Sequence, residues 1–271
     1  TTLYKMDKNS AGTPDGIWDS VPGGTVWDSY TKLMLHCDGT DASTTFTDEI
    51  GKTVTANGNA QIDTAQFKFS TASGLFDGTG DYLTTPDHDD WNFGSGDFTI
   101  DVWVRHNGAI PNGNYPVLVS HYGSAGNRSW LFYLINTAGT ITAKLDYSTN
   151  GTATTTIESS SITVSSATWY HFAVVRNGNT ITIYQNGVSK GTGDVTGVTF
   201  YNSTASLAVG QYTDFSDNLA SWNGWIDELR VSKGIARWTA DFTPSTSAYS
   251  ASALPLTSSR YWTFGDWQSG R

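Results

Sequence analysis

Hydrophobic and polar residues alternate in short runs along most of the chain, and 98–105 is the clearest of these runs. Every second residue from Phe98 to Val104 is apolar, while Asp101, Trp103 and Arg105 occupy positions of the opposite parity. Successive side chains of a β-strand point to opposite faces, so this run predicts a strand with one face in a core. The other face is predicted to be polar, with one large aromatic ring.

Turn residues separate the runs from one another. Asn177-Gly178 and Asn186-Gly187 supply the positive φ that tight hairpin turns need, which predicts two consecutive hairpins. The other predicted strands are 33–36, 52–56, 74–77, 82–84, 117–121, 130–135, 140–147, 169–176, 180–185, 207–210 and 225–231. A helical turn or two is expected only at 232–238. This pattern predicts an all-β fold, an antiparallel β-sandwich or jelly roll.

The composition also favours strands and turns over helices. Only three of the 25 acidic residues are glutamates, namely Glu49, Glu158 and Glu228, and the others are aspartates. Aspartate favours turns, caps and the ligation of hard cations. The formal charge of -10, without a cluster of Lys and Arg, disfavours nucleic acids and anionic membranes as partners. No stretch approaches the roughly 20 apolar residues of a membrane helix.

Two irregular arms are predicted to flank one compact domain. The expected organisation is an N-terminal arm at 1–30, a jelly-roll domain at 31–244 and a C-terminal aromatic arm at 245–271. Tryptophan is an anchor residue of protein interfaces, so the arm tryptophans are candidates for docking on a neighbouring subunit. The alternative is that they pack back on their own domain. These interface candidates are Trp18, Trp27, Trp262 and Trp267.

Four segments, in order along the chain, resemble strands of laminin-G-like (LamG) jelly rolls in the concanavalin A-like lectin/glucanase class. They are GLFDGTGDYL at 74–83, DFTIDVWV at 97–104, the hairpin at 169–187 and GWIDELRV at 224–231. The likeness extends over about 33–244 and implies a β-sandwich of that class. Fold-level likeness alone does not locate a ligand site.

A narrower resemblance concerns the two ends of the predicted domain. The segments LMLHCDG at 33–39 and VSKGIARW at 231–238 are similar to the version common in tailed-phage and prophage virion proteins. This implies a non-catalytic structural or display protein at the virion surface, as a capsid decoration or a tail or fibre component. Its implied partners are neighbouring virion subunits or further copies of itself, together with cell-surface glycans. Outside a virion, the expected location is extracellular.

The resemblance also implies a structural Ca²⁺ ion. In this fold class such an ion is often held near the first and last strands by an aspartate of the closing strand, early acids and carbonyls. Asp227 matches the closing-strand position and Asp38 is the nearest early acid, while Asp77 and Asp81 flank a glycine-rich turn. Oxygen ligands of this kind suit Ca²⁺. The alternative is that these aspartates cap turns through nearby backbone amides.

Two loops mix aromatic rings with Asp and Asn, the residue types that contact sugars. The first loop spans 86–93, and the second spans 211–218 together with Trp222 and Asn223. The competing interpretation, which we favour, is that their aromatic rings close the ends of the sandwich. The candidate ligand-binding residues are Asp89, Asp90, Trp91, Tyr212, Asp214 and Trp222.

Two further functions remain open beside virion display. The first is a stand-alone, Ca²⁺-dependent, lectin-like adhesin. The second, more remote, is a glycoside hydrolase, which needs two carboxyl groups placed across the scissile bond. The three glutamates lie far apart in the sequence and form no such pair on one strand. The expectation is therefore a protein that is not an enzyme.

Overall fold

The computed structural model describes residues 25–213 and 218–253. Contacts divide the chain into two compact units, Ser29–Tyr249 and a unit formed by Thr1–Asp28 with Ser250–Arg271. In the described part of the latter, β1 (Thr25–Val26) pairs antiparallel with β17 (Ser252–Ala253).

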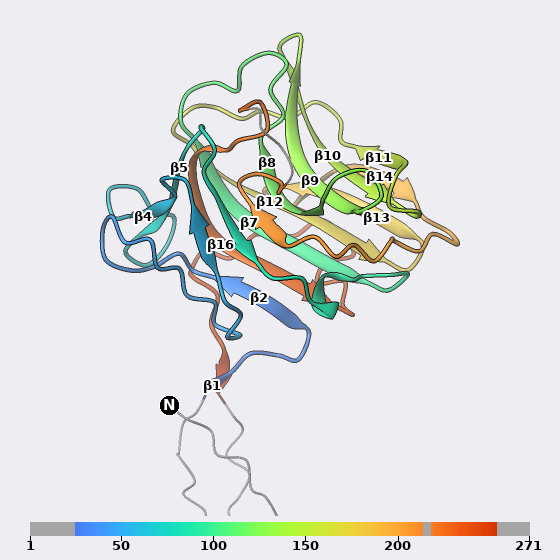
Figure 1. The fold of residues 1–271 in the computed structure, drawn as a ribbon, viewed down its shortest axis with the longest axis horizontal. Helices are drawn as coiled ribbons and strands as arrows, with labels where there is room; N and C mark the ends of the chain where they lie inside the picture. The colour runs from blue at the N-terminus through green and yellow to red at the C-terminus, as the bar shows by residue number, and fades with distance from the viewer. Residues whose placement is uncertain (1–24, 214–217, 254–271) are drawn as a thin grey trace, which may run out of the picture. The chain divides into compact units, whose positions relative to one another are not determined.

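The larger unit, Ser29–Tyr249, is a sandwich of two antiparallel sheets (Figure 1). The seven-stranded sheet has the order β11 (Thr154–Glu158), β10 (Thr140–Ser148), β9 (Arg128–Thr137), β8 (Val117–Tyr122), β15 (Leu207–Val209), β6 (Tyr82–Thr85) and β3 (Thr55–Asn57). The eight-stranded sheet has the order β14 (Val188–Asp194), β13 (Thr180–Gln185), β12 (Trp169–Asn177), β7 (Phe98–His106), β16 (Asn223–Lys233), β5 (Ser73–Asp77) and β4 (Gln61–Asp63), and β2 (Thr31–Leu35) also pairs with β16. The predicted fold class is confirmed.

The core lies between the two sheets, and the alternation in β7 determines which side chains enter it. Phe98, Ile100, Val102 and Val104 are fully buried in the main hydrophobic cluster, together with residues of the opposite sheet such as Phe132. The alternate residues of β7 lie on the outer face of the eight-stranded sheet. The face assignment made from the sequence is therefore confirmed for this strand.

Two strands of the sandwich, β4 and β11, were missed by the sequence patterns. Both are short edge strands with few apolar residues, whereas β14, which reads VSKGTGD, follows the predicted second hairpin turn. Each pairs with a stronger neighbouring strand. Pairing at a sheet edge can be specified by that neighbour, so the edge strand itself needs little hydrophobic signal.

The prediction of a helical turn or two at 232–238 was wrong. β16 continues to Lys233, and the residues after it are not helical. The Gly234 amide donates to the carbonyl of Asp97, and the Arg237 amide donates to Thr99 Oγ1. These amides bond to residues at the start of β7 instead of to carbonyls one helical turn back.

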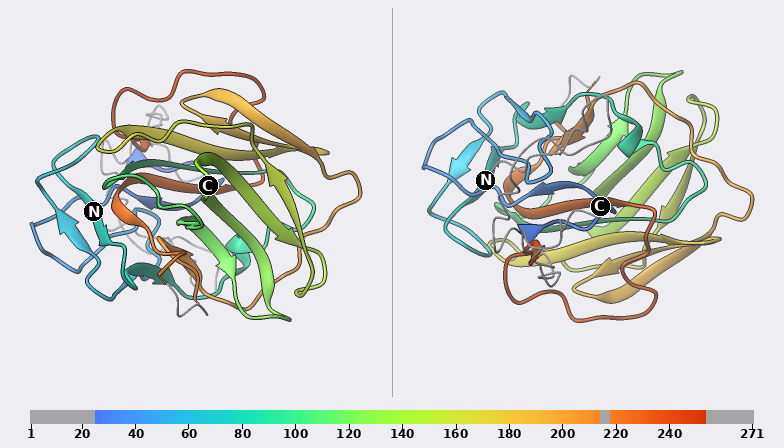
Figure 2. Two further views of the ribbon diagram at one scale, coloured as in Figure 1. Left: turned by 90° about the horizontal axis from the view of Figure 1, so that it is seen from above. Right: turned by 90° about the horizontal axis from the view of Figure 1, so that it is seen from below.

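Residues 234–249, which we call the strap, run along the outer face of the eight-stranded sheet. Figure 2 shows this segment, after β16, outside the yellow strands β12 and β13. Trp238 and Phe242 stack with ring centroids 3.9 Å apart and pack on a small cluster of Ala173, Val175 and Tyr184. The strap therefore gives the outer face of this sheet its own small apolar cluster.

Among the described residues, no helix is long and apolar enough to cross a membrane.

Candidate functional site

Beyond the residues under the strap, a row of large side chains crosses the outer face of the eight-stranded sheet. Trp169 of β12 lies opposite Arg105 of β7, and Arg105 lies opposite Trp225 of β16. Directly opposed residues of antiparallel strands have Cβ atoms about 5 Å apart on one face, so the three side chains are neighbours. All three are partly exposed. We call them the aromatic row.

Direct contacts hold two members of the aromatic row, Arg105 and Trp225, in position. The Arg105 guanidinium carbon lies 4.7 Å from the centroid of the Trp225 ring, a cation–π geometry. Trp225 Nε1 donates to Asp63 Oδ2 of β4 at 2.5 Å. The Trp225 ring is thus held at its nitrogen edge by Asp63, with the guanidinium over its face.

A second cation–aromatic pair adjoins the row. The Lys68 ammonium lies 4.1 Å from the ring centroid of Trp103, two residues before Arg105 on the same face of β7. Burial lowers the pKa of Lys68. The loop that carries Lys68 is tied to the sheet because Asp227 Oδ2 accepts hydrogen bonds from the amides of Lys68 and Phe69. This part of the face is therefore built on strands and on a loop pinned to them.

The strap covers a buried ion pair on the same face. Arg230 donates to both carboxylate oxygens of Asp101, at 3.0 and 3.2 Å, and Tyr249 Oη donates to Asp101 Oδ2 at 2.7 Å. His171 Nε2 lies 3.6 Å from the same oxygen. Burial alone would raise the pKa of Asp101, but Arg230 and His171 lower it to about 2. This network is closed off by the strap and serves to hold the strap on the sheet.

The four aspartates predicted to bind Ca²⁺ fall in two places. Asp77 lies opposite Asn223 at one end of the β5–β16 pairing, and Asp227 lies four residues further along β16, about 13 Å at the usual rise of a strand. Asp81 accepts from the amides of Asn59 and Asp77, and Asp77 accepts from the amide of Thr79. The oxygens of Asp77 and Asp81 therefore act as turn caps, as the alternative interpretation expected.

Asp227 and Asp38 form the other pair. Asp227 is buried, and burial raises its pKa to about 7, with the charges of Glu228 and Asp38 adding to the increase. Its Oδ1 atom is buried and has no hydrogen-bond partner among the described residues. Asp38 Oδ1 accepts from the Thr71 amide. Within the described ranges, no group of three or more His, Cys, Asp or Glu residues is gathered as a metal site.

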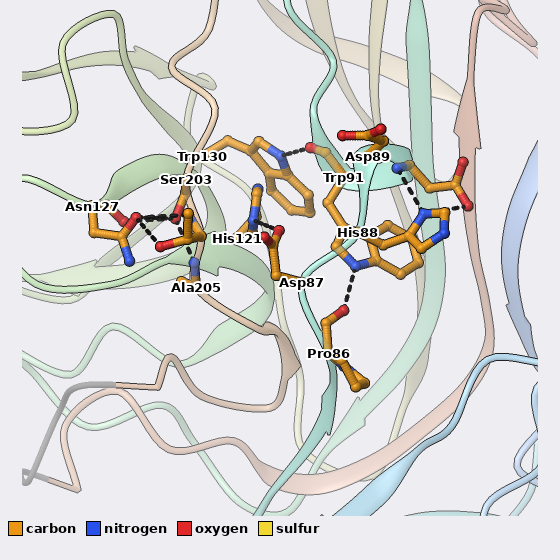
Figure 3. A network of polar contacts seen from close by, with 12 residues as sticks. Pro86, Asp87, His88, Asp89, Trp91, His121, Asn127, Trp130, Ser203 and Ala205 are labelled. Atoms are coloured by element: carbon orange, nitrogen blue, oxygen red, sulfur yellow. Dashed lines mark hydrogen bonds and ion pairs between the residues drawn. The ribbon is translucent and has the colours of Figure 1, made fainter.

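The first predicted ligand loop is held in place by internal contacts (Figure 3). Trp91 is fully buried, its Nε1 donates to the Pro86 carbonyl, and its own carbonyl accepts from Trp130 Nε1. Asp90 lies 2.7 Å from the Lys52 ammonium. Trp91 thus has no free ring face for stacking on a sugar. Its candidacy as a ligand residue was wrong, and its burial agrees with the favoured interpretation that this ring is structural. Asp89 is exposed in the short 3₁₀ turn η1 (Asp89–Trp91).

Figure 3 also shows a contact between His121 and Asp87 beneath this loop. His121 is fully buried, its Nε2 lies 3.4 Å from Asp87 Oδ1, and burial lowers its pKa. Ser203 Oγ is bonded to Asn127. The arrangement ties the loop to β8 and gives no nucleophile in contact with the imidazole.

The second predicted ligand loop is also mostly structural. Trp222 is fully buried and meets His106 edge-on, with ring centroids 5.2 Å apart, so it cannot offer a ring face to a sugar. Tyr212 is largely buried beside Tyr122 on the outer face of the seven-stranded sheet. Asp214 lies outside the described residues.

Three of the four interface candidates in the arms lie outside the described residues, namely Trp18, Trp262 and Trp267. Trp27 is partly exposed and belongs to the smaller unit. Docking of the arms on a neighbouring subunit stays a prediction.

The three glutamates lie in three different settings. Glu228 is buried and its Oε1 lies 2.6 Å from His36 Nδ1, Glu158 pairs with Lys144 at the edge of the seven-stranded sheet, and Glu49 is exposed in a turn. They do not come together as a pair across a groove.

The sequence patterns missed the aromatic row. They placed Trp103 and Arg105 on the outer face of their strand, but did not connect them with Trp169 or Trp225, which lie 64 and 120 positions beyond Arg105. One signal in the sequence could have grouped these residues. Each of them occupies an alternate position of its strand that faces away from the core. Only the strand register shows that they are neighbours.

Comparisons with known proteins agree with the architecture. No curated protein matches the chain. The binding domain of Paraclostridial Mosquitocidal Protein 1 is 16% identical, with a TM-score of 0.58 and coverage of 76% of this chain and 49% of that chain. The botulinum neurotoxin serotype C1 binding domain has the same identity and coverage and a TM-score of 0.55. The botulinum neurotoxin DC binding domain in complex with SialylT is also 16% identical, with a TM-score of 0.56 and the same coverage.

At these identities the solved structures share only their fold with this chain, which spans about half their length. The family match is independent of them. The model of the Laminin_G_3 family of the concanavalin A-like lectin/glucanases superfamily matches residues 76–237. This match covers more than half of the sequence and includes every strand that supplies the aromatic row. The chain therefore belongs to the Laminin_G_3 family of the concanavalin A-like lectin/glucanases superfamily.

Proposed function

We propose that the chain is a non-catalytic carbohydrate-binding domain and that the aromatic row is its ligand-binding face. The observation that carries this proposal is the placement of Trp169 and Trp225 on either side of Arg105, partly exposed, on three adjacent strands. Aromatic rings stack on the apolar faces of sugars, and a few polar groups then fix the orientation of the ligand. Among the structures of similar fold is a binding domain in complex with SialylT, which supports a ligand of this class.

A glycan array with the full chain tests this proposal, followed by titration calorimetry on the ligands found. Trp169→Ala and Trp225→Ala are expected to weaken binding about tenfold or more, equivalent to about 1.4 kcal/mol, because each removes one stacking ring. Tyr82→Ala is the matched control, since Tyr82 is a partly exposed aromatic residue on the other sheet. Retained binding in both tryptophan variants, or no binding to any glycan, would contradict the proposal. A released-sugar assay on the same ligands tests the non-catalytic role, which sugar release would overturn.

We propose in addition that the domain is displayed on the surface of a phage particle. The support is the resemblance of 33–39 and 231–238 to phage and prophage virion proteins. In the structure these two segments lie side by side, because Leu33 of β2 pairs with Val231 of β16. Mass spectrometry of purified particles, with a fixed copy number relative to the major capsid protein, is the expected evidence. Recovery only as a free extracellular protein would favour the lectin-like adhesin instead.

We also propose a Ca²⁺ ion at Asp227 and Asp38. The unpartnered, buried Oδ1 atom of Asp227 suits a cation ligand, and Asp38 is close enough to raise the pKa of Asp227. Two carboxylates would have to be completed by backbone carbonyls and water, which Ca²⁺ accepts. The oxygens of Asp77 and Asp81 are engaged in their turn, which makes that turn the weaker candidate.

Thermal unfolding with Ca²⁺, Mg²⁺ or EDTA tests the Ca²⁺ proposal. Ca²⁺ at 100 times its Kd is expected to stabilise the protein by about 2.7 kcal/mol, with no such effect in Asp227→Asn. Asp81→Asn is the control that should keep the response to Ca²⁺. Equal melting temperatures of the unaltered protein in Ca²⁺ and EDTA would contradict the proposal.

A further inference from the structure

We propose that Arg105 binds a carboxylate group, so that the aromatic row selects acidic sugars, such as sialic or uronic acids, over neutral ones. This inference rests on the proposed carbohydrate-binding function and names the ligand class of the same face.

The Arg105 guanidinium is held in place without its charge being neutralised. It lies over the Trp225 ring at 4.7 Å from the centroid. A guanidinium can stack on an aromatic ring and still donate hydrogen bonds from its edge, in the fork geometry that matches a carboxylate. Stacking on Trp225 therefore orients the group without occupying its donors.

No carboxylate of the described residues takes up those donors. None of the ion pairs in the described ranges includes Arg105, although the whole chain has 25 acidic and only 15 basic residues. Arg230, on the neighbouring strand of the same face, shows the contrast because Asp101 binds it through both carboxylate oxygens. Arg128 and Arg176 also take part in none of these ion pairs, but both donate side-chain hydrogen bonds to backbone carbonyls. The Arg105 guanidinium, by contrast, donates no hydrogen bond to any of the described residues.

The surroundings of Arg105 add positive charge. Lys68 rests on Trp103 at 4.1 Å from the ring centroid, and Trp103 and Arg105 are two residues apart on one face, about 7 Å along the strand. Lys68 also takes part in none of the ion pairs of the described residues.

The carboxylates near Arg105 and Lys68 accept hydrogen bonds from other donors. Asp63 accepts from Trp225 Nε1 and from the Ala65 amide, and Asp227 accepts from the amides of the loop around Lys68. The face therefore offers two aromatic-supported cations to a ligand. A sugar that stacks on Trp169 or Trp225 and carries a carboxylate would place that group beside Arg105 and form a charge-assisted, two-point hydrogen bond. A neutral sugar of the same shape would lack that contact.

The test compares matched ligands that differ only in the acidic group. Sialyllactose is titrated against lactose, and oligouronates against the same oligomers after reduction of their carboxyl groups, on the full chain by calorimetry. The acidic member of a pair is expected to bind at least tenfold more tightly. Arg105→Gln is expected to remove this preference, by lowering the affinity for the acidic member of each pair at least tenfold more than the affinity for the neutral member, and Arg105→Lys is expected to retain part of the preference. Lys144→Gln is the control, because Lys144 lies in the other sheet.

The outcomes separate this inference from the function on which it rests. Equal binding of acidic and neutral ligands, or an acidic preference that survives in Arg105→Gln, overturns the role of Arg105 and leaves carbohydrate binding intact. No binding to any glycan overturns both. If Arg105→Gln does not fold, the role of Arg105 is still tested by comparing acidic and neutral ligands on the unaltered protein and on Arg105→Lys. Whether sialic or uronic acids are preferred follows from which ligand pair shows the larger difference.

Discussion

At the scale of single residues, Asp101 shows how a charged group can be buried on the outside of a sheet. Its carboxylate accepts hydrogen bonds from Arg230 and Tyr249, and His171 lies close by. Removing charges from water is costly, and the cost is offset only when the partners are well placed. The strap supplies Tyr249 and excludes water, so the ion pair and the strap depend on each other.

Replacing this carboxylate should be strongly destabilising. Asp101→Asn is expected to lower the free energy of unfolding by about 3 kcal/mol, because the Arg230 charge stays buried without its counter-charge. Urea denaturation near neutral pH measures this loss. Asp89→Asn is the control, since Asp89 is exposed, and it should change the free energy by less than about 0.5 kcal/mol. A loss of similar size in both variants would contradict the argument.

The same carboxylate predicts a pH dependence. The folded-state pKa of Asp101 lies at about 2, below its ordinary value of 3.8, because Arg230 and His171 favour its charged form. A lowered folded pKa contributes stability that is present above pH 4 and is lost as the pH falls through 2. The shift corresponds to about 2 kcal/mol. The difference in stability between the unaltered protein and Asp101→Asn should therefore narrow on acidification from pH 4 to pH 2.

At the scale of elements, the strongly alternating strands were predictable and the strap was not. β7, β12 and β13 carry their own periodicity and hairpin turns, so their faces follow from the sequence. The strap has no regular hydrogen-bond pattern of its own. Its path is determined by where Trp238 and Phe242 find apolar surface, which exists only after the sheet has formed.

The two Asn-Gly turns offer a matched test of how closely the strap approaches. Gly178 and Gly187 both have positive φ, at 57° and 78°. A Cβ atom on Gly178 would meet nothing within 4 Å, whereas one on Gly187 would lie 1.8 Å from the Phe242 carbonyl oxygen. Gly178→Ala is therefore expected to cost only the backbone strain of about 1 to 2 kcal/mol. Gly187→Ala should cost clearly more, because it also displaces the strap.

Urea unfolding measures both costs. Tryptic cleavage after Arg237, within the strap, reports displacement of the strap independently of global stability. Faster cleavage is expected in Gly187→Ala alone. Equal cleavage rates in the two variants would show that the strap does not depend on this contact.

At the scale of the whole molecule, the boundary of the sandwich lies after Tyr249. The larger compact unit spans Ser29–Tyr249, whereas the sequence placed the end of the domain at residue 244. The added residues matter because the Tyr249 amide donates to Glu228 Oε2 and its ring lies 3.9 Å from the Arg230 guanidinium carbon. These contacts close the strap over the sheet.

Two truncations test this boundary. A chain of residues 29–249 is expected to fold and to unfold cooperatively, because it holds the whole sandwich and the strap. A chain of residues 29–244 lacks Tyr249 and should have a lower melting temperature, with Asp101 and Arg230 less well covered. Circular dichroism during heating measures both. Identical melting temperatures would show that Tyr249 adds nothing to the sandwich.

The sequence by itself determined the fold class, most of the strands, the core face of β7 and the resemblance to its family. These are local properties, because alternation and turn residues act over a few neighbouring positions. Edge strands such as β11 were missed because their pairing partners specify them. Trp91 and Trp222 were offered as sugar contacts, since composition alone does not reveal which aromatic residues the loops bury.

Only the tertiary structure decided which side chains are neighbours on the outer face of the eight-stranded sheet. Trp169, Arg105 and Trp225 come together through the register of three strands that are far apart in the chain. The strap then decides which part of that face is closed. Register and strap position depend on the packing of the complete sandwich, so no short segment of the sequence carries them.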